Sequence, residues 1–230
     1  MFRVRRTRSR ADFEFQSLAD SLDGMRVGIV SDIHCNAAGL ELALKRMGRV
    51  DELLCAGDAI FEYRFGNEVL EILQDHKAHY VLGNHEHVML DHRGVRAREA
   101  PHVKPENLAY VASRPNTIEM NLDGKQLLMT HSSPVAPFTQ YVYPGHADLK
   151  KFATIEADYI VIGHTHMQMA QRVGRALVIN PGSAGDGRDH RNGRKLSYAV
   201  LDTATDQVLI DNFEVGDGEL PEFAEALGER

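Results

Sequence analysis

The chain has 230 residues, of which 43% are hydrophobic and 26% charged, and its formal net charge at pH 7 is −7. These proportions are typical of a soluble globular protein and exclude a disordered or fibrous chain. The acidic balance argues against stable nucleic-acid binding, and without a run of about eighteen apolar residues no membrane association is expected.

Residues 1–24 are predicted to form an Arg-rich leader, with one domain over 25–230. Five arginines stand between positions 3 and 10. A nucleic-acid arm and a transit peptide are alternatives, but a mobile leader with a short helix over 15–22 is favoured because termini are usually loosely held. Cys35 and Cys55 match neither a zinc knuckle nor a disulfide framework, so we expect free thiols and a cytoplasmic protein.

From Met25 onward the pattern strand, loop, helix repeats, which is typical of βαβ units around a mostly parallel sheet. Each apolar run is short enough for a buried strand, and the helical segments show capping signals. The expected strands are 26–30, 53–56 and 79–82, and the expected helices lie between Asn36 and Gly48 and over 67–74.

The second half of the chain begins with a polar stretch, 92–115, that contains three prolines. It predicts a long loop around a short helix near 107–112, which can form a wall beside a substrate. Asp123-Gly124, flanked by alternating apolar and polar residues, predicts a hairpin and a change to antiparallel pairing. The expected strands are 117–122, 126–130, 159–162, 176–179, 197–202 and 207–213, followed by an acidic helix at 219–227.

Polar residues directly follow five of the predicted strands. Ligands of open α/β sheets bind beyond the carboxyl ends of the strands, so these side chains can meet at one place. In an extended segment, residues i and i+2 project to the same side, and each such pair can present two donors to one centre. The five blocks are Ser31-Asp32-Ile33-His34, Gly57-Asp58, Gly83-Asn84-His85-Glu86, Thr130-His131 and Gly163-His164-Thr165-His166.

The donor atoms in these blocks are carboxylate oxygens, imidazole nitrogens and one amide oxygen. Without a thiolate, they suit two divalent ions of Mn, Fe, Co, Ni or Zn, with Mn expected to serve best in vitro. A lone histidine is more often a surface or core residue than a ligand, and the asparagine could instead cap a helix. The candidate metal ligands are Asp32, His34, Asp58, Asn84, His131, His164 and His166.

In their order, the five blocks resemble the motifs D-x-H, G-D, G-N-H-[DE], a lone His and G-H-x-H of the calcineurin-like metallophosphoesterases, over residues 25–202. The segment 178–183 resembles the small prokaryotic, phosphodiesterase-like branch. The resemblance implies an α/β sandwich of two packed mixed β-sheets flanked by helices. It also implies that Asp32, His34, Asp58 and His166 hold one metal, and that Asp58, Asn84, His131 and His164 hold the other, with Asp58 bridging.

The implied activity is hydrolysis of phosphodiesters or small phosphomonoesters by a hydroxide that bridges the two ions. His85 corresponds to the catalytic histidine, which contacts the phosphoryl group or protonates the leaving oxygen, a role that suits a group titrating near neutral pH. Glu86 either orients His85 or places a negative charge at a helix N-terminus.

One departure bears on the substrate. Protein phosphatases of this superfamily continue G-D with x-x-D-R-G, whereas Gly57-Asp58 continues with Ala-Ile-Phe-Glu-Tyr-Arg, so a small phosphorylated substrate is expected rather than a phosphoprotein. Arg64 and the arginines of 188–194 are alternatives for a phosphate clamp, or solvated charges. The other functions considered are a noncatalytic scaffold and a dinucleoside-polyphosphate or cyclic-nucleotide hydrolase; the oligomeric state is left open.

Overall fold

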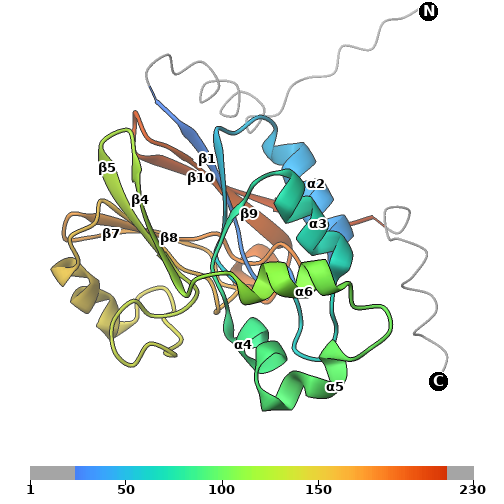
Figure 1. Cartoon of the computed structure of the whole chain (residues 1–230). Coiled ribbons are helices and arrows are strands. Elements are labelled where there is room, and N and C mark those ends of the chain that lie inside the picture. The colour runs from blue at the N-terminus through green and yellow to red at the C-terminus, as the bar shows by residue number, and fades with distance from the viewer. Residues whose placement is uncertain (1–23, 217–230) are drawn as a thin grey trace, which may run out of the picture.

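Two five-stranded mixed sheets form the centre of the protein in the computed structural model, which describes residues 24–216 (Figure 1). The strand orders are β10-β9-β1-β2-β3 and β4-β5-β6-β8-β7. Helices flank the sheets, so the predicted sandwich is confirmed. The Arg-rich leader before Gly24 and the helix expected at 219–227 lie outside the described residues and stay predictions.

The first sheet is built on β1, which pairs in parallel with β2 and antiparallel with β9. Asn36 caps the first helix by accepting a hydrogen bond from the Gly39 N–H at 2.8 Å, and that helix ends at Gly48, as expected. The elements are β1 (Arg26–Val30), α2 (Ala37–Met47), β2 (Glu52–Cys55), α3 (Asn67–Asp75), β3 (His79–Tyr80), β9 (Leu196–Asp202) and β10 (Gln207–Phe213).

The second sheet opens with the predicted hairpin, in which Asp123 and Gly124 have φ values of 50° and 82°. It also contains β7, which the sequence did not predict, because three of its five residues are exposed and it pairs only as an edge strand. The elements are β4 (Thr117–Leu122), β5 (Lys125–Thr130), the 3-10 segment η2 (Ala147–Thr154), β6 (Tyr159–Val161), β7 (Met169–Val173), β8 (Ala176–Asn180) and η3 (His190–Asn192).

The short helix expected near 107–112 is present as part of α6, but the rest of the segment 92–115, expected as loop, is more helical than predicted, and another helix, α4, precedes it. The Asp91 carboxylate accepts a hydrogen bond from the Arg93 N–H, and the Arg98 guanidinium donates to the carbonyl groups of Met89 and Asp91. These hydrogen bonds join residues up to nine positions apart. They involve side chains and therefore produce no periodic pattern of hydrophobic residues in the sequence. The helices are α4 (Asn84–Leu90), η1 (His92–Gly94), α5 (Val95–Arg98) and α6 (Pro105–Ala112).

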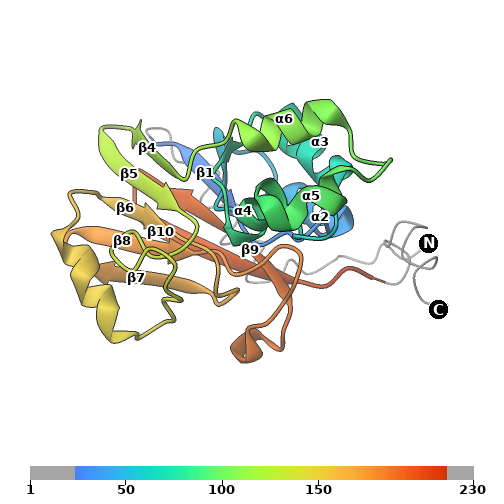
Figure 2. The ribbon, with the colours of Figure 1, turned by 60° about the horizontal axis from the view of Figure 1, so that its bottom comes forward.

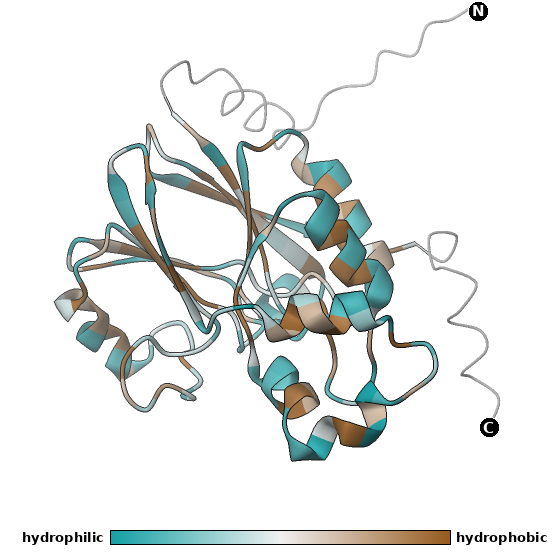
Figure 3. Ribbon diagram, viewed as in Figure 1, coloured by the Kyte–Doolittle hydropathy of each residue, from teal (hydrophilic) through white to brown (hydrophobic). Residues whose placement is uncertain are grey.

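Apolar side chains fill three layers. Val27 and Ile29 of β1 face the second sheet, while Val30 packs with α2 and α3 on the other face. Figure 2 shows α2 to α6 gathered on one side of the molecule and η2 on the opposite side. Figure 3 shows hydrophobic residues both on the strands and on the helices that cover them. Within residues 24–216, no helix is long and apolar enough to cross a membrane.

A buried carboxylate ties two loops of the first sheet together. Glu86, in the first turn of α4, accepts hydrogen bonds from the N–H groups of Asp58, Ile60 and Gly83 at 3.0, 3.1 and 2.7 Å and from the Tyr80 hydroxyl at 2.7 Å. Burial, with the nearby charge of Asp58, raises the pKa of Glu86 to about 7. Of the two roles considered for Glu86, the structure supports the one at the helix N-terminus.

Replacing this carboxylate leaves four buried donors without their acceptor. Glu86→Ala is therefore expected to lower the free energy of unfolding by about 3 kcal/mol, measured by urea denaturation in EDTA. Glu68→Ala, which removes an exposed glutamate from the first turn of α3, is the matched control and should change little. Similar midpoints for the two variants would show that Glu86 does not hold the loops.

Candidate metal centre

The five polar blocks converge at one end of the sandwich, and both sheets contribute to the site. Three blocks follow strands β1, β2 and β3 of the first sheet, and two follow β5 and β6 of the second. The six aspartate and histidine candidates are at most 8% exposed, whereas Asn84 is exposed. They form two clusters, Asp32 with His34 and His166, and Asp58 with His131 and His164, whose ligand atoms within each cluster lie within 4.8 Å of one another.

In the first cluster, Nε2 of His166 lies 3.1 Å from Nε2 of His34 and 3.3 Å from Oδ1 of Asp32. Nδ1 of His166 lies 2.6 Å from the Asp186 carbonyl. A carbonyl only accepts hydrogen bonds, so Nδ1 carries the proton and Nε2 presents a lone pair to the cluster. Burial lowers the pKa of His34 to about 3, which keeps this imidazole neutral as a metal ligand must be.

In the second cluster, Nε2 of His131 lies 3.1 Å from both Oδ2 of Asp58 and Oδ1 of Asn84, and its Nδ1 donates to the Ala56 carbonyl at 2.7 Å. Burial alone lowers the pKa of His131, but the Asp58 carboxylate outweighs it and raises this pKa to about 10. The His131 imidazole is therefore protonated, and its positive charge lies beside the Asp58 carboxylate. The arrangement therefore favours positive charge at this place.

Three buried side-chain atoms of the two clusters have no hydrogen-bond partner among the described residues: Oδ1 of Asp32, Nδ1 of His34 and Nε2 of His164. Orphaned buried polar atoms are rare and call for a ligand or an ion. Burial lowers the pKa of His164 to about 4, so this imidazole is neutral. The oxygen and nitrogen donors, with no sulfur, fit divalent transition-metal ions.

Asp58 lies within reach of both clusters, because its carboxylate groups with His34 and His85 as well as with His131 and His164. Burial raises its pKa, but the charge and hydrogen bond of His131 prevail and hold the pKa well below its usual range. A Cβ atom at Gly83 would collide with the Asp58 carboxylate, which explains the glycine of the third block.

The backbone at the site is not extended, so the geometric basis of the i, i+2 prediction was wrong. Asp32 and His34 nevertheless lie in one cluster, whereas His164 and His166 belong to different clusters. In both pairs the two residues turn back in the left-handed region. Non-glycine residues seldom adopt positive φ, and such residues cluster at functional sites. The φ values are 52° for Asp32, 50° for His34, 52° for Asp58, 68° for His164 and 56° for His166.

His85 belongs to neither of the two clusters, but its imidazole groups with His34 and Asp58, one member of each. Its Nε2 lies 3.7 Å from Oδ2 of Asp58, and its backbone N–H donates to Oδ1 of the same carboxylate at 3.0 Å. On its other side, Nδ1 contacts the Glu62 carboxylate, and the ring stacks on Phe61 with centroids 4.7 Å apart. Burial lowers the pKa of His85, although Asp58 opposes this shift.

Glu62 is the site residue that the sequence reasoning missed. The segment after Gly57-Asp58 was interpreted only as lacking the Asp-Arg pair of protein phosphatases, yet it contains a carboxylate one place beyond the absent aspartate. The turn that carries Glu62 is held by Cys35, whose Sγ accepts from the Phe61 N–H and donates to the Arg64 carbonyl, both at 3.3 Å. Cys35 and Cys55 are free thiols, as predicted.

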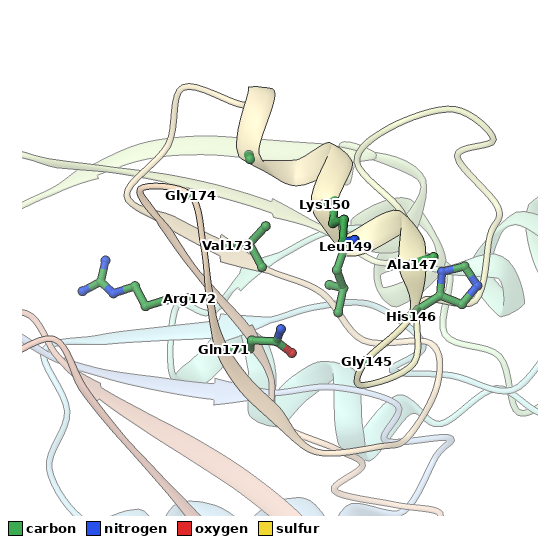
Figure 4. A pocket seen from close by; sticks show the side chains of 10 residues that line it. Gly145, His146, Ala147, Leu149, Lys150, Gln171, Arg172, Val173 and Gly174 are labelled. Carbon is green, nitrogen blue, oxygen red and sulfur yellow. The ribbon is translucent and has the colours of Figure 1, made fainter.

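Two of the three arginines of 188–194 pair with neighbouring carboxylates, while Arg194 contacts the His190 imidazole. Arg188 pairs with Asp186 at 2.5 Å, and Arg191 pairs with Asp189 at 2.6 Å. A separate groove of 540 Å³ lies between η2 and β7 (Figure 4). Its lining includes Lys150 but none of the seven candidate ligands, so it is distinct from the centre.

Comparisons with known proteins agree with this geometry. The model of the calcineurin-like phosphoesterase superfamily domain matches residues 25–206. An uncharacterized protein of Methanocaldococcus jannaschii is 28% identical over an alignment of 211 positions, and the match covers 76% of this chain and 82% of that protein. A metallophosphoesterase of Sphaerobacter thermophilus superposes with a TM-score of 0.69 at 25% identity, over 87% of this chain and 96% of that one.

A hypothetical protein of Pyrococcus horikoshii shares the fold with a TM-score of 0.67 at 18% identity, over 88% of this chain and 96% of that one. These three relatives are bacterial or archaeal, in agreement with the small prokaryotic branch. The family model covers well over half of the chain and includes all five polar blocks. The chain belongs to the calcineurin-like phosphoesterase superfamily.

Proposed function

We propose that the protein hydrolyses phosphodiesters or small phosphomonoesters with two divalent metal ions. The observation that carries the proposal is the pair of buried donor clusters with Asp58 in reach of both. Membership of a phosphoesterase superfamily supports a hydrolase of phosphoric esters. The two free thiols support a reducing compartment, the cytoplasm.

The first ion would be held by Asp32, His34, Asp58 and His166, and the second by Asp58, Asn84, His131 and His164. Any of Mn, Fe, Co, Ni or Zn suits this set of imidazole, carboxylate and amide donors. When bound, two such ions activate water as a nucleophile and offset the charge of the phosphoryl oxygens. The hydrogen bonds from Nδ1 of His166 and His131 to backbone carbonyls fix the orientation of both rings.

His85 would supply the proton that the leaving oxygen needs. Its Nε2 faces the Asp58 carboxylate, while Glu62 and the stacked Phe61 ring hold the imidazole from the other side. Glu62 is thus a positioning residue, in a place where the orienting aspartate of the protein phosphatases is missing. The presence of His85 in this contact favours an enzyme over a noncatalytic scaffold of the same fold.

The metal proposal predicts that protein incubated with manganese and desalted retains close to two ions per chain. Asp58→Asn should lower the occupancy of both sites, because one shared carboxylate serves both clusters. Elemental analysis measures this, and Asp75→Asn, an exposed aspartate at the end of α3, is the control. Only trace metal in the wild type would remove the basis of the mechanism, and loss of a single ion would mean that Asp58 is not shared.

The substrate proposal predicts hydrolysis of bis-p-nitrophenyl phosphate with manganese, at least as readily as of p-nitrophenyl phosphate. No Asp-Arg pair follows Asp58 to grip a phosphate dianion, and Arg188 is already paired with Asp186. Phosphoserine peptides should therefore be poor substrates. Efficient dephosphorylation of such peptides, together with an inert diester, would contradict the proposal.

The role of His85 predicts a dependence on the leaving group. His85→Asn should keep both metals and lose about 10²- to 10⁴-fold in rate on alkyl or nucleoside leaving groups, but much less on nitrophenyl esters, which leave without a proton. Glu62→Gln should show the same trend with a smaller loss. The control is His87→Asn, an exposed histidine of the same helix.

Steady-state rates over a leaving-group series, with metal content measured on each variant, separate the possible outcomes. Equal losses of His85→Asn across the series would show that this side chain stabilises or positions the phosphoryl group instead. Loss of a metal ion would show that His85 is a ligand.

A further inference from the structure

Exposed aromatic side chains gather beside the candidate metal centre. Residues 132–146, here called the aromatic loop, connect His131 at the end of β5 to η2. The loop carries three of the five exposed large hydrophobic side chains in the described part of the chain. They are Phe138, Tyr141 and Tyr143, which are 67%, 49% and 44% exposed.

The two tyrosines are held in place by the core beneath them. Val142, between them, is only 2% exposed and packs in the same cluster as Leu149 and Phe152 of η2. Tyr141 and Tyr143 are therefore directed outward on either side of an anchored residue. Their rings are nearly parallel, with an angle of 14° between the planes and 6.2 Å between the centroids. The orientation of the two rings is therefore set by the packing of Val142 against η2.

The aromatic surface begins at a candidate metal ligand. The Tyr141 ring stacks on the His164 imidazole with centroids 3.7 Å apart and planes 24° apart, and the Thr139 backbone hydrogen-bonds the same imidazole. His164 belongs to the cluster with His131, whereas His85 lies against His34 of the other cluster, with ring centroids 4.7 Å apart. His85 and Tyr141 thus contact different candidate ligands of the centre, His34 and His164.

We propose that Tyr141 and Tyr143 form a stacking subsite for a nucleobase, so that the preferred substrates are phosphodiesters of nucleosides. This inference rests on the proposed function. It identifies the nucleoside as the ester group that remains bonded to phosphorus after the leaving group has departed. Aromatic faces stack on any base, and a tyrosine loses little side-chain entropy when it does so. An exposed aromatic patch that adjoins a phosphoryl site matches a ligand that joins a planar ring to a phosphate.

A protein partner is the other occupant to consider, and the size of the patch argues against it. A stable protein interface buries about 800 Å² on each partner. Three half-exposed aromatic side chains offer roughly 300 Å², since each buries 150–250 Å² when fully covered. That area suits one or two planar rings.

The test uses two diesters with the same leaving group and charge, thymidine 5′-(p-nitrophenyl phosphate) and methyl p-nitrophenyl phosphate. With manganese, the wild type should show a kcat/KM about tenfold higher for the thymidine ester. Tyr143→Leu should remove most of this advantage without changing the rate on the methyl ester, and Tyr143→Phe should retain it. Val95→Ala, which shortens an exposed hydrophobic side chain of α5, should leave the ratio unchanged.

A binding measurement separates the subsite from the reaction. Titration calorimetry should show AMP binding at least about fivefold more tightly than ribose 5-phosphate, with the difference lost in Tyr143→Leu. This result with no turnover of either diester would overturn the proposed function and keep the subsite. Equal affinities of AMP and ribose 5-phosphate, or turnover of both diesters with equal kcat/KM, would overturn the subsite.

Discussion

The candidate centre depends on a backbone that turns back at the end of each strand. Five of the buried candidate ligands have φ between 50° and 68°, a conformation that costs non-glycine residues on the order of 1–3 kcal/mol each. Hydrogen bonds between loops hold these turns, because the N–H groups of Asp32 and His34 donate to the carbonyls of Gly57 and Asp58, both at 3.0 Å. The Glu86 carboxylate also accepts hydrogen bonds from three backbone N–H groups in the loops after β2 and β3. The strained turns persist because hydrogen bonds from neighbouring loops stabilise them.

The same turns crowd acids and imidazoles into a space with little water. Burial raises the pKa of Asp32 and lowers the pKa of His34 and His164, so the site favours neutral forms of these groups. His131 is the exception, since the Asp58 carboxylate keeps it protonated. Buried charged groups are costly unless they are paired, so a cation that pairs with these carboxylate and imidazole donors would stabilise the site.

Much of this centre could be predicted from the sequence, because strand ends carry information about position. Apolar runs mark the strands, and the polar residue that follows each run must lie at the same edge. Strand ends made the isolated His131 a candidate ligand, and the family resemblance grouped it with Asp58, beside which it lies. The backbone conformation could not be predicted in this way, because the left-handed turns of Asp32 and His34 depend on hydrogen bonds to another loop. Glu62 was missed for a similar reason, since its contact with His85 follows from the fold of a turn.

The fold also explains why two sheets are needed. Asp32 and His34 follow β1 of the first sheet, while His166, which completes their cluster, follows β6 of the second. The other cluster is likewise mixed, with Asp58 from the first sheet and His131 and His164 from the second. Neither cluster can form on one sheet alone, so the apolar layer that contains Val27 and Ile29 sets the distance between the halves of both.

Two segments beside the candidate metal centre are held in place by different contacts. The turn of Glu62 and Tyr63 is tied to the first sheet through Cys35, while the aromatic loop is anchored through Val142 on the outer face of the second. Neither segment contributes a candidate metal ligand or a side chain of the layer between the sheets, although Tyr141 of the aromatic loop stacks on the imidazole of His164. The proposed stacking subsite and the proposed positioning residue Glu62 thus lie in these two segments, apart from the candidate metal ligands at the strand ends.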